Sequence, residues 1–200
     1  MALAAAREIA EADGLRGLTA RRIAGRIGYS VGTLYNLFED LDGLIVRLHL
    51  TTRDALHEAC ARAPRTGEPE ADLRALARGY IGFTGEHPRL WNLLFEHRLP
   101  EGRPLPDWYQ EKVARLLALV EAAIAPLFPA GREVERLHSA RVLWSSLHGM
   151  CSVASASKLA EGESLAAMAD SLATNYVAGL RYRAAARAVG DDETHHLRSE

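Results

Sequence analysis

LTARRIAGRIGYSVGTLYNLF, residues 18–38, holds two short amphipathic segments with a glycine between them. Apolar residues recur at helical spacing in both segments, and Thr19 and Ser30 stand where N-cap residues would begin each helix. Gly28 lies where a left-handed residue typically ends a helix. The pattern predicts two helices joined by a tight turn, which is the form of a helix-turn-helix.

The second segment carries polar residues that a protein core does not need. Its apolar residues are Val31, Leu34, Leu37 and Phe38. Between them stand Gly32, Thr33, Tyr35 and Asn36. A helix this short is not stable alone, so we expect Leu34, Leu37 and Phe38 to anchor it against neighbouring helices. The polar residues then project outward on a rigid platform.

This outward face suits the major groove of DNA. Asn36 can pair with a base edge, while Thr33 and Tyr35 can donate to phosphate oxygens. Residues 14–38 contain four arginines and no acid, which adds positive charge beside the face. We expect DNA contacts from Thr19, Arg21, Arg22, Tyr29, Ser30, Gly32, Thr33, Tyr35 and Asn36. Short helix pairs also occur in proteins that never bind nucleic acid, so the pattern alone leaves DNA binding open.

The remaining sequence favours an all-α chain. It has 200 residues, a net charge of −2 and 48% hydrophobic residues, which allows a sizeable core. Helix-forming residues dominate and β-branched runs are absent. A first helix should end at Gly14. Further helices are expected near 41–62, 70–86, 88–98, 107–127, 133–160 and 164–188.

Several protein classes are disfavoured by what the sequence lacks. Cys60 and Cys151 lie far apart and match no metal or redox spacing, which suits a reducing cytoplasm. No apolar run is long enough to predict a membrane span, and the N-terminus lacks a signal-peptide pattern. Histidines are scattered, and no common catalytic or nucleotide-binding motif occurs. We therefore expect a cytoplasmic protein that is not an enzyme, does not enter membranes and needs no cofactor or metal.

The segment LTARRIAGRIGYSVGTLYNLFEDLDGLI, residues 18–45, resembles the DNA-binding segment of the TetR family of bacterial transcription regulators. The match covers residues 2 to about 48. It runs through Thr19, Ile23, Ala24, Gly28, Ser30, Gly32, Thr33, Leu34, Tyr35 and Phe38. HPRLWNLLF at 87–95 resembles a stretch of the family's sensor half, and LWSSLHG at 143–149 is similar to the Trp-x-x-x-His-Gly motif of one C-terminal subgroup.

The resemblance implies an N-terminal three-helix domain with a helix-turn-helix, joined by a long helix to a helical ligand-binding and dimerisation domain. Residues 1–48 would form the first domain, with the helix-turn-helix at 19–38, and 49–188 the second. The polar residues 189–200 are expected to form a flexible tail. The implied function is a repressor that binds a palindromic operator in double-stranded DNA as a homodimer and is released by a small-molecule effector.

One region departs from the family pattern. Where many members carry a lysine near the start of the fourth helix, this chain has Leu41, flanked by Glu39, Asp40 and Asp42. Residues 1–48 contain six arginines and six acids, so the segment is neutral overall. We therefore predict weak, strongly salt-dependent DNA binding. The same feature supports the alternative of a helical partner-binding module whose DNA binding is weakened or lost.

The bulky residues of the C-terminal half have two interpretations. Trp144 and His148 are four apart and share a helix face. Aromatic residues at helical spacing usually form core, but the resemblance implies a small-molecule cavity in this half. We expect the cavity to be lined by Phe83, Trp91, Phe95, Trp144 and His148.

An apolar stripe in the last predicted helix predicts either an association surface or packing within the chain. We expect the first, because a two-fold dimer also explains recognition of a palindromic site. The residues expected in the dimer interface are Leu165, Met168, Leu172, Tyr176 and Leu180.

Overall fold

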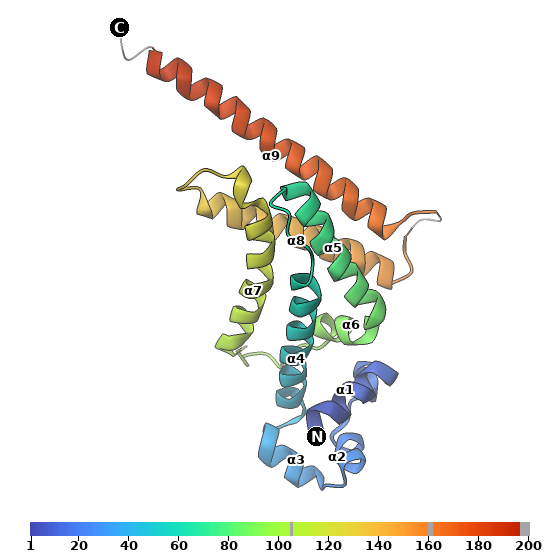
Figure 1. The fold of residues 1–200 in the computed structure, drawn as a ribbon. Helices are drawn as coiled ribbons and strands as arrows, with labels where there is room; N and C mark the ends of the chain where they lie inside the picture. Colours follow the sequence, from blue (N-terminus) through green and yellow to red (C-terminus); the bar gives the residue numbers. More distant parts are fainter. Residues whose placement is uncertain (105, 160–161, 197–200) are drawn as a thin grey trace. The chain divides into compact units, whose positions relative to one another are not determined.

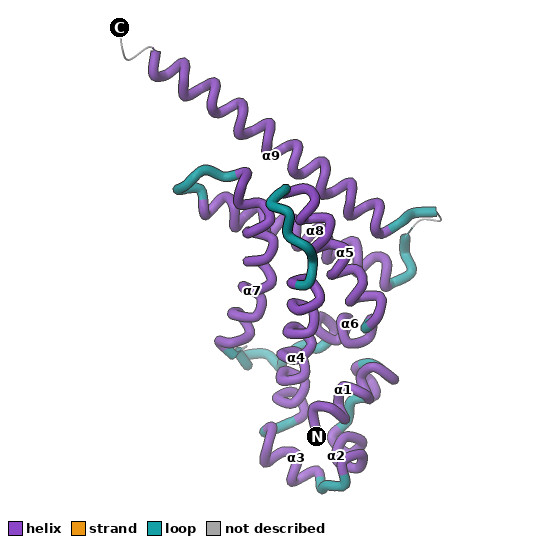
Figure 2. The backbone as a smooth tube through the Cα atoms, in the orientation of Figure 1, coloured by secondary structure: helices purple, strands orange, loops and turns teal. Residues whose placement is uncertain are grey.

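The structure is a computed structural model that describes residues 1–104, 106–159 and 162–196, with side chains as far as residue 187. These described residues contain helices and no strand, which confirms the all-α prediction (Figures 1 and 2). The α-helices are α1 (Ala2–Asp13), α2 (Ala20–Ile27), α3 (Val31–Phe38), α4 (Leu41–Ala61), α5 (Pro69–Glu86), α6 (Pro88–Glu96), α7 (Asp107–Ile124), α8 (Glu133–Ser155) and α9 (Leu165–His196). Two short 3-10 helices are η1 (Leu15–Gly17) and η2 (Ala125–Leu127).

The helices form two compact units. The first unit contains residues 1–59 and 82–115, and the second contains residues 60–81 and those from 116 onward. The sequence placed the domain boundary at residue 48, whereas the first unit also includes α6 and the first part of α7. The physical reason is that α6 packs against α1 and supplies Leu90 and Leu93 to the same buried cluster.

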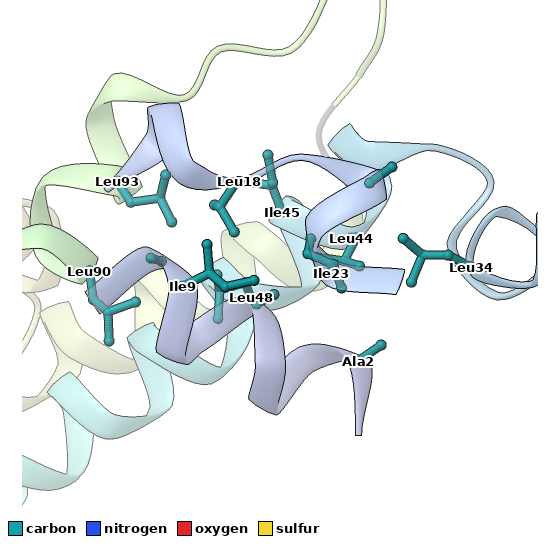
Figure 3. Close-up of a cluster of buried hydrophobic side chains, with 13 residues drawn as sticks. Ala2, Ile9, Leu18, Ile23, Leu34, Leu44, Ile45, Leu48, Leu90 and Leu93 are labelled. Carbon is teal, nitrogen blue, oxygen red and sulfur yellow. The ribbon is translucent and has the colours of Figure 1, made fainter. Parts of the chain in front are cut away.

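The core of the first unit holds the helix-turn-helix in place. Figure 3 shows its buried side chains gathered between the ribbons of α1, α2, α4 and α6, with Leu34 reaching in from α3. The cluster includes Ile9, Leu18, Ile23, Leu34, Leu44, Ile45, Leu48, Leu90 and Leu93. Burying a leucine or isoleucine side chain contributes about 1.5–3 kcal/mol. Stability of the two short helices therefore comes from this shared core rather than from their own hydrogen bonds.

Both predicted helix starts and the turn between them are confirmed. Thr19 Oγ1 accepts the backbone N–H of Arg22 at 3.2 Å, and Ser30 Oγ accepts that of Thr33 at 3.1 Å. Each cap satisfies a helix N–H that has no partner within the helix. Gly28 adopts φ 74° and ψ 24°, the left-handed conformation that closes α2.

The last helix extends beyond its expected end. α9 continues to His196, so residues 189–196 of the predicted flexible tail are helical, and residues 197–200 lie outside the described residues. The segment contains no proline, and Gly190 alone weakens a helix by only about 1 kcal/mol relative to alanine. A polar sequence can therefore continue as a helix.

Candidate nucleic-acid interface and ligand cavity

The polar residues of α3 lie on its exposed side. Gly32, Thr33, Tyr35 and Asn36 are all exposed, whereas Leu34 retains 1% of its accessible surface. Thr19, Arg21, Arg22, Tyr29 and Ser30, the other residues expected at DNA, are exposed as well. The Thr33 hydroxyl lies 3.0 Å from Ser30 Oγ, so the two side chains hold each other at the start of the helix.

The prediction that Leu37 anchors α3 is wrong. Leu37 is 64% exposed, while Val31 and Phe38 are half-buried and pack against the core cluster. At about 100° per residue, Leu37 lies about 60° around the helix from Leu34, on the flank opposite to Val31 and Phe38. α3 is therefore anchored chiefly through Leu34, and Leu37 lies beside its polar face.

Part of the basic block is engaged within the chain. Arg22 pairs with Asp13, and Arg26 Nη2 lies 2.7 Å from Glu8 Oε2. All four side chains are about half exposed, so these pairs contribute little to stability. They nevertheless lower the positive charge that α2 presents to a phosphate backbone.

The junction between α3 and α4 is closely built. Glu39 has φ 66°, and Asp40 Oδ1 accepts the Gly43 backbone N–H at 2.7 Å, which caps α4. A Cβ at position 43 would lie 2.2 Å from the Phe38 carbonyl oxygen, so the close approach requires glycine. The Gly43 N–H, followed by the Arg103 guanidinium, lowers the pKa of Asp40 below its ordinary value.

Two basic groups from beyond α6 reach the acids of this junction. Arg103 Nη1 donates to Asp40 Oδ2 at 2.6 Å, and Arg103 Nη2 lies 3.6 Å from Glu39 Oε2. His97 Nε2 donates to Asp42 Oδ1 at 2.9 Å. Sequence reasoning missed both contacts because the partners are separated by 63 and 55 residues. No local pattern could have revealed them.

The second unit contains a small apolar cavity of about 40 Å³ lined by side chains of α4, α5, α7, α8 and α9. Its walls are Cys60, Leu73, Leu76, Ala77, Tyr80, Leu116, Leu119, Val120, Leu143, Trp144, Leu147, Ala169, Leu172 and Ala173. The rings of Tyr80 and Trp144 meet edge to face at 5.0 Å. The Tyr80 hydroxyl and His148 Nδ1 form a hydrogen bond of 3.1 Å. Trp144 thus lines the cavity, and His148 is linked to it through Tyr80.

The other expected pocket residues lie in the first unit and do not line this cavity. Trp91 is buried, with its ring 5.3 Å from that of the exposed Phe95. Phe83 is also buried, 5.0 Å from the ring of His87. Aromatic spacing along a helix marks a buried face, but it does not identify the helices that cover that face.

The stripe expected in a dimer interface faces the protein's own chain. Leu180 is buried, and Leu172 lines the cavity of the same chain. Leu165, Met168 and Tyr176 are half-buried. Ala169, Ala173 and Val177, which stand between the stripe residues on the same helix, are buried too. The structure therefore favours the alternative of intrachain packing, because α8 and α9 of one chain already pack together.

Other chemistries find little support in the described part of the chain. It contains no group of three or more histidine, cysteine or acidic side chains that could hold a metal ion. None of its helices is long and apolar enough to cross a membrane. Cys60 and Cys151 are buried and are not joined in a disulfide, and burial raises the pKa of Cys60 to about 12, which keeps its thiol protonated.

Comparison with known protein families gives two matches. Residues 2–48 match the family described as bacterial regulatory proteins of the tetR family. Residues 73–176, slightly over half of the chain, match the family described as tetracyclin repressor-like, C-terminal domain. No match was found among the curated proteins.

Solved structures with the same fold include several regulators. The regulatory protein SCO4313 is 25% identical, with a TM-score of 0.70 over 88% of this chain and 92% of that one. A TetR-like transcriptional regulator from Rhodococcus sp. RHA1 is 22% identical, with a TM-score of 0.63 over 89% and 94%. The regulator SCO7222, a TetR from Streptomyces coelicolor, is 22% identical, with a TM-score of 0.58 over 90% and 91%.

Proposed function

The chain belongs to the TetR family of bacterial regulatory proteins, and from this premise we propose that it is a ligand-responsive repressor that binds a palindromic operator as a homodimer. The family consists of DNA-binding regulators rather than enzymes. The observation that carries the proposal is the exposed polar face of α3, held rigidly by the buried Leu34. Such a repressor acts in the bacterial cytoplasm, where its operator lies.

On DNA, the side chains of α3 would divide into two roles. Asn36 would pair with a base edge, most naturally adenine, and so determine sequence. Tyr35 would donate to a phosphate oxygen, which positions the helix without selecting a base. Arg21, exposed at the start of α2, would add a phosphate contact.

The exposed faces of α8 and α9 would form the dimer interface. On α8 this face contains Val134, Arg141, Val142, Ser145, Gly149, Ser152 and Val153. On α9 it contains Ala167, Ser171, Asn175, Ala178 and Tyr182. Small residues let helices of two copies approach closely, and the valines would supply apolar contact. Two-fold symmetry would then place two recognition helices about 34–36 Å apart, or a multiple of one DNA turn.

The cavity of the second unit would be the effector site. A ligand bound there would favour a conformation in which the two recognition helices no longer match successive major grooves. Linkage requires that ligand and operator weaken each other's binding by the same factor.

Selection of DNA bound by the full chain from a random pool tests the proposal most directly. We expect enrichment of a palindrome, and sedimentation should give a dimer at micromolar concentration. The double variant Asn36→Ala, Tyr35→Ala is the control, because both side chains are exposed and their loss leaves the core intact. Recovery of unselected sequences, or a monomer in sedimentation, would contradict the proposal.

A second candidate is a helical module that binds another protein and has lost DNA binding. The ion pairs of Arg22 and Arg26 with acids of α1 favour it, because they withdraw positive charge from the DNA face. The same selection separates the two functions, since this module would enrich no sequence.

A further inference from the structure

The wall of the cavity in the second unit is uncharged. Eleven of its fourteen residues are alanine, valine or leucine, and the other three are Cys60, Tyr80 and Trp144. The Tyr80 hydroxyl is engaged with His148, and the Cys60 thiol stays protonated because burial raises its pKa to about 12. An ionised ligand would meet no opposite charge there.

The uncharged wall of the cavity favours neutral ligands over ionised ones. Moving an ionised group from water to an apolar site is highly unfavourable unless a partner of opposite charge receives it. An apolar wall offers water no hydrogen-bond partners and favours apolar molecules. Its volume of about 40 Å³ admits few atoms without rearrangement, so a larger ligand would have to displace leucine side chains.

We propose that the effector is an uncharged, largely apolar small molecule that carries at most one hydroxyl-type group, placed at the Tyr80–His148 pair. The inference rests on the proposed ligand response and names the chemical class of the ligand. Apolar groups would pack against Trp144 and the leucines, while the hydroxyl would exchange hydrogen bonds with Tyr80.

Three one-ring compounds that differ in charge and polarity test this class: benzene, phenol and benzoate. At saturating concentration, benzene and phenol should raise the Tm of the full chain by about 2–4 °C for each 1 kcal/mol of binding, whereas benzoate should not. Ala77→Val, which adds two carbon atoms at the cavity wall, should abolish the shift. Ala118→Val is the matched control, because Ala118 is exposed on α7.

Leu76→Ala provides a second variant, since it enlarges the cavity and should increase the shift caused by benzene. Equal stabilisation by benzoate, or an unchanged benzene shift in Ala77→Val, would overturn the ligand class. The absence of any shift in both the natural chain and Leu76→Ala would overturn it too. DNA binding is measured separately: apolar probes that bind without weakening the operator complex would contradict the ligand response while supporting the ligand class.

A second inference comes from the acids at the α3–α4 junction. Glu39, Asp40 and Asp42 immediately follow the helix proposed to enter the major groove, where carboxylates would repel DNA phosphates. Arg103 bonds Asp40 at 2.6 Å and approaches Glu39 at 3.6 Å, so it returns positive charge to the junction. Its 63-residue separation from Asp40 places it far outside the helix-turn-helix segment.

We infer that Arg103 is a positioning residue for DNA binding, acting through Asp40. Its guanidinium neutralises the carboxylate that caps α4 and fixes the turn that joins the end of α3 to α4. The inference rests on the proposed DNA binding and is independent of the effector site.

The selected operator and a set of arginine variants test this role. Arg103→Ala should weaken operator binding about three- to tenfold at low salt, and the loss should shrink as salt screens the exposed acids. Arg98→Ala is the matched control: it removes the same charge from an exposed position five residues earlier. In the double variant that combines Arg103→Ala with Asp40→Asn, operator binding should recover, because asparagine still caps α4 but carries no charge.

Arg103→Lys should keep most of the operator affinity, because it keeps the positive charge. It tests the role of that charge even where the alanine variant misfolds. Equal losses in Arg98→Ala and Arg103→Ala, or no recovery with Asp40→Asn, would overturn the role of Arg103. Failure of the natural chain to bind any DNA would overturn the proposed function and this inference together.

Discussion

α3 and α9 have similar amphipathic patterns but opposite relations to their surroundings. In α3, one fully buried leucine fixes eight residues, and the polar side remains exposed. In α9, the apolar stripe is covered by the same chain, and small residues make up much of the exposed side. A sequence pattern therefore identifies the face of a helix that will be covered, but it does not identify the molecule that covers that face.

The largest expected effect tests the anchors of the two helices. Leu34→Ala and Leu180→Ala should each lower the free energy of unfolding by about 2–5 kcal/mol, because both side chains are buried. Only Leu34→Ala should also weaken DNA binding at a temperature where both variants are folded. Denaturation curves and gel shifts measure the two effects. If Leu180→Ala changed the oligomeric state but not the stability, the apolar stripe of α9, and not its exposed face, would have to form the dimer interface.

A smaller effect is expected from the exposed side of α3. Asn36→Ala should lose about 1–3 kcal/mol of binding at one base position and relax selection there. Tyr35→Phe should weaken binding to all sequences equally, because a phosphate contact does not specify a base. Titration of the operator and of its single-base variants checks both. A uniform loss with Asn36→Ala would remove its role in base recognition.

His49, buried in the first unit, should make the stability of the chain depend on pH. Burial, followed by the nearby His97 and Arg53, lowers the pKa of His49 from 6.5 to about 3. Below pH 6.5 the unfolded chain binds a proton at this residue and the folded chain does not, so stability falls as the pH drops toward 3. The expected loss is roughly 1 kcal/mol per pH unit.

His49→Gln should remove this component, measured as the slope of unfolding free energy between pH 6 and 4.5. Other groups with lowered pKa values, including His57 and Asp40, are common to both proteins and cancel in the difference. Identical slopes would show that His49 does not contribute to acid destabilisation.

The cap and the exposed leucine of α3 should give the smallest effects. Ser30→Ala should cost about 1 kcal/mol, because the Thr33 N–H loses its partner. Leu37→Ala should change stability by less than about 0.5 kcal/mol, since its side chain is mostly in solvent. Thermal unfolding measures both. A large effect of Leu37→Ala would restore it as an anchor and make α3 resemble α9 more closely.

Local features of the fold could be predicted well from the sequence. Thr19, Ser30 and Gly28 act within a few residues, so their caps and turn follow from the chain alone. Leu37 was misplaced because the neighbours of an eight-residue helix determine how wide its buried face is. Similarly, the aromatic residues Trp91 and Trp144 looked equivalent in the sequence, yet they lie in different compact units.

Contacts between distant segments could not be predicted. Arg103 and His97 reach the acids of the α3–α4 junction only because α6 and the loop after it fold against the start of α4. From the sequence alone, these acids predicted a deficit of positive charge at the DNA face. Folding supplies a positive charge from Arg103 and a hydrogen-bond donor from His97, two residues that no short motif includes.

The close approach at Gly43 has a consequence for how the chain can change over time. A single added methyl group would collide with the Phe38 carbonyl and force the two helices at that corner apart. A substitution at position 43 would therefore disturb the helix that carries the proposed DNA face without changing any residue of that face. In a library of random variants, position 43 should be among the most intolerant sites, although its side chain is one hydrogen atom.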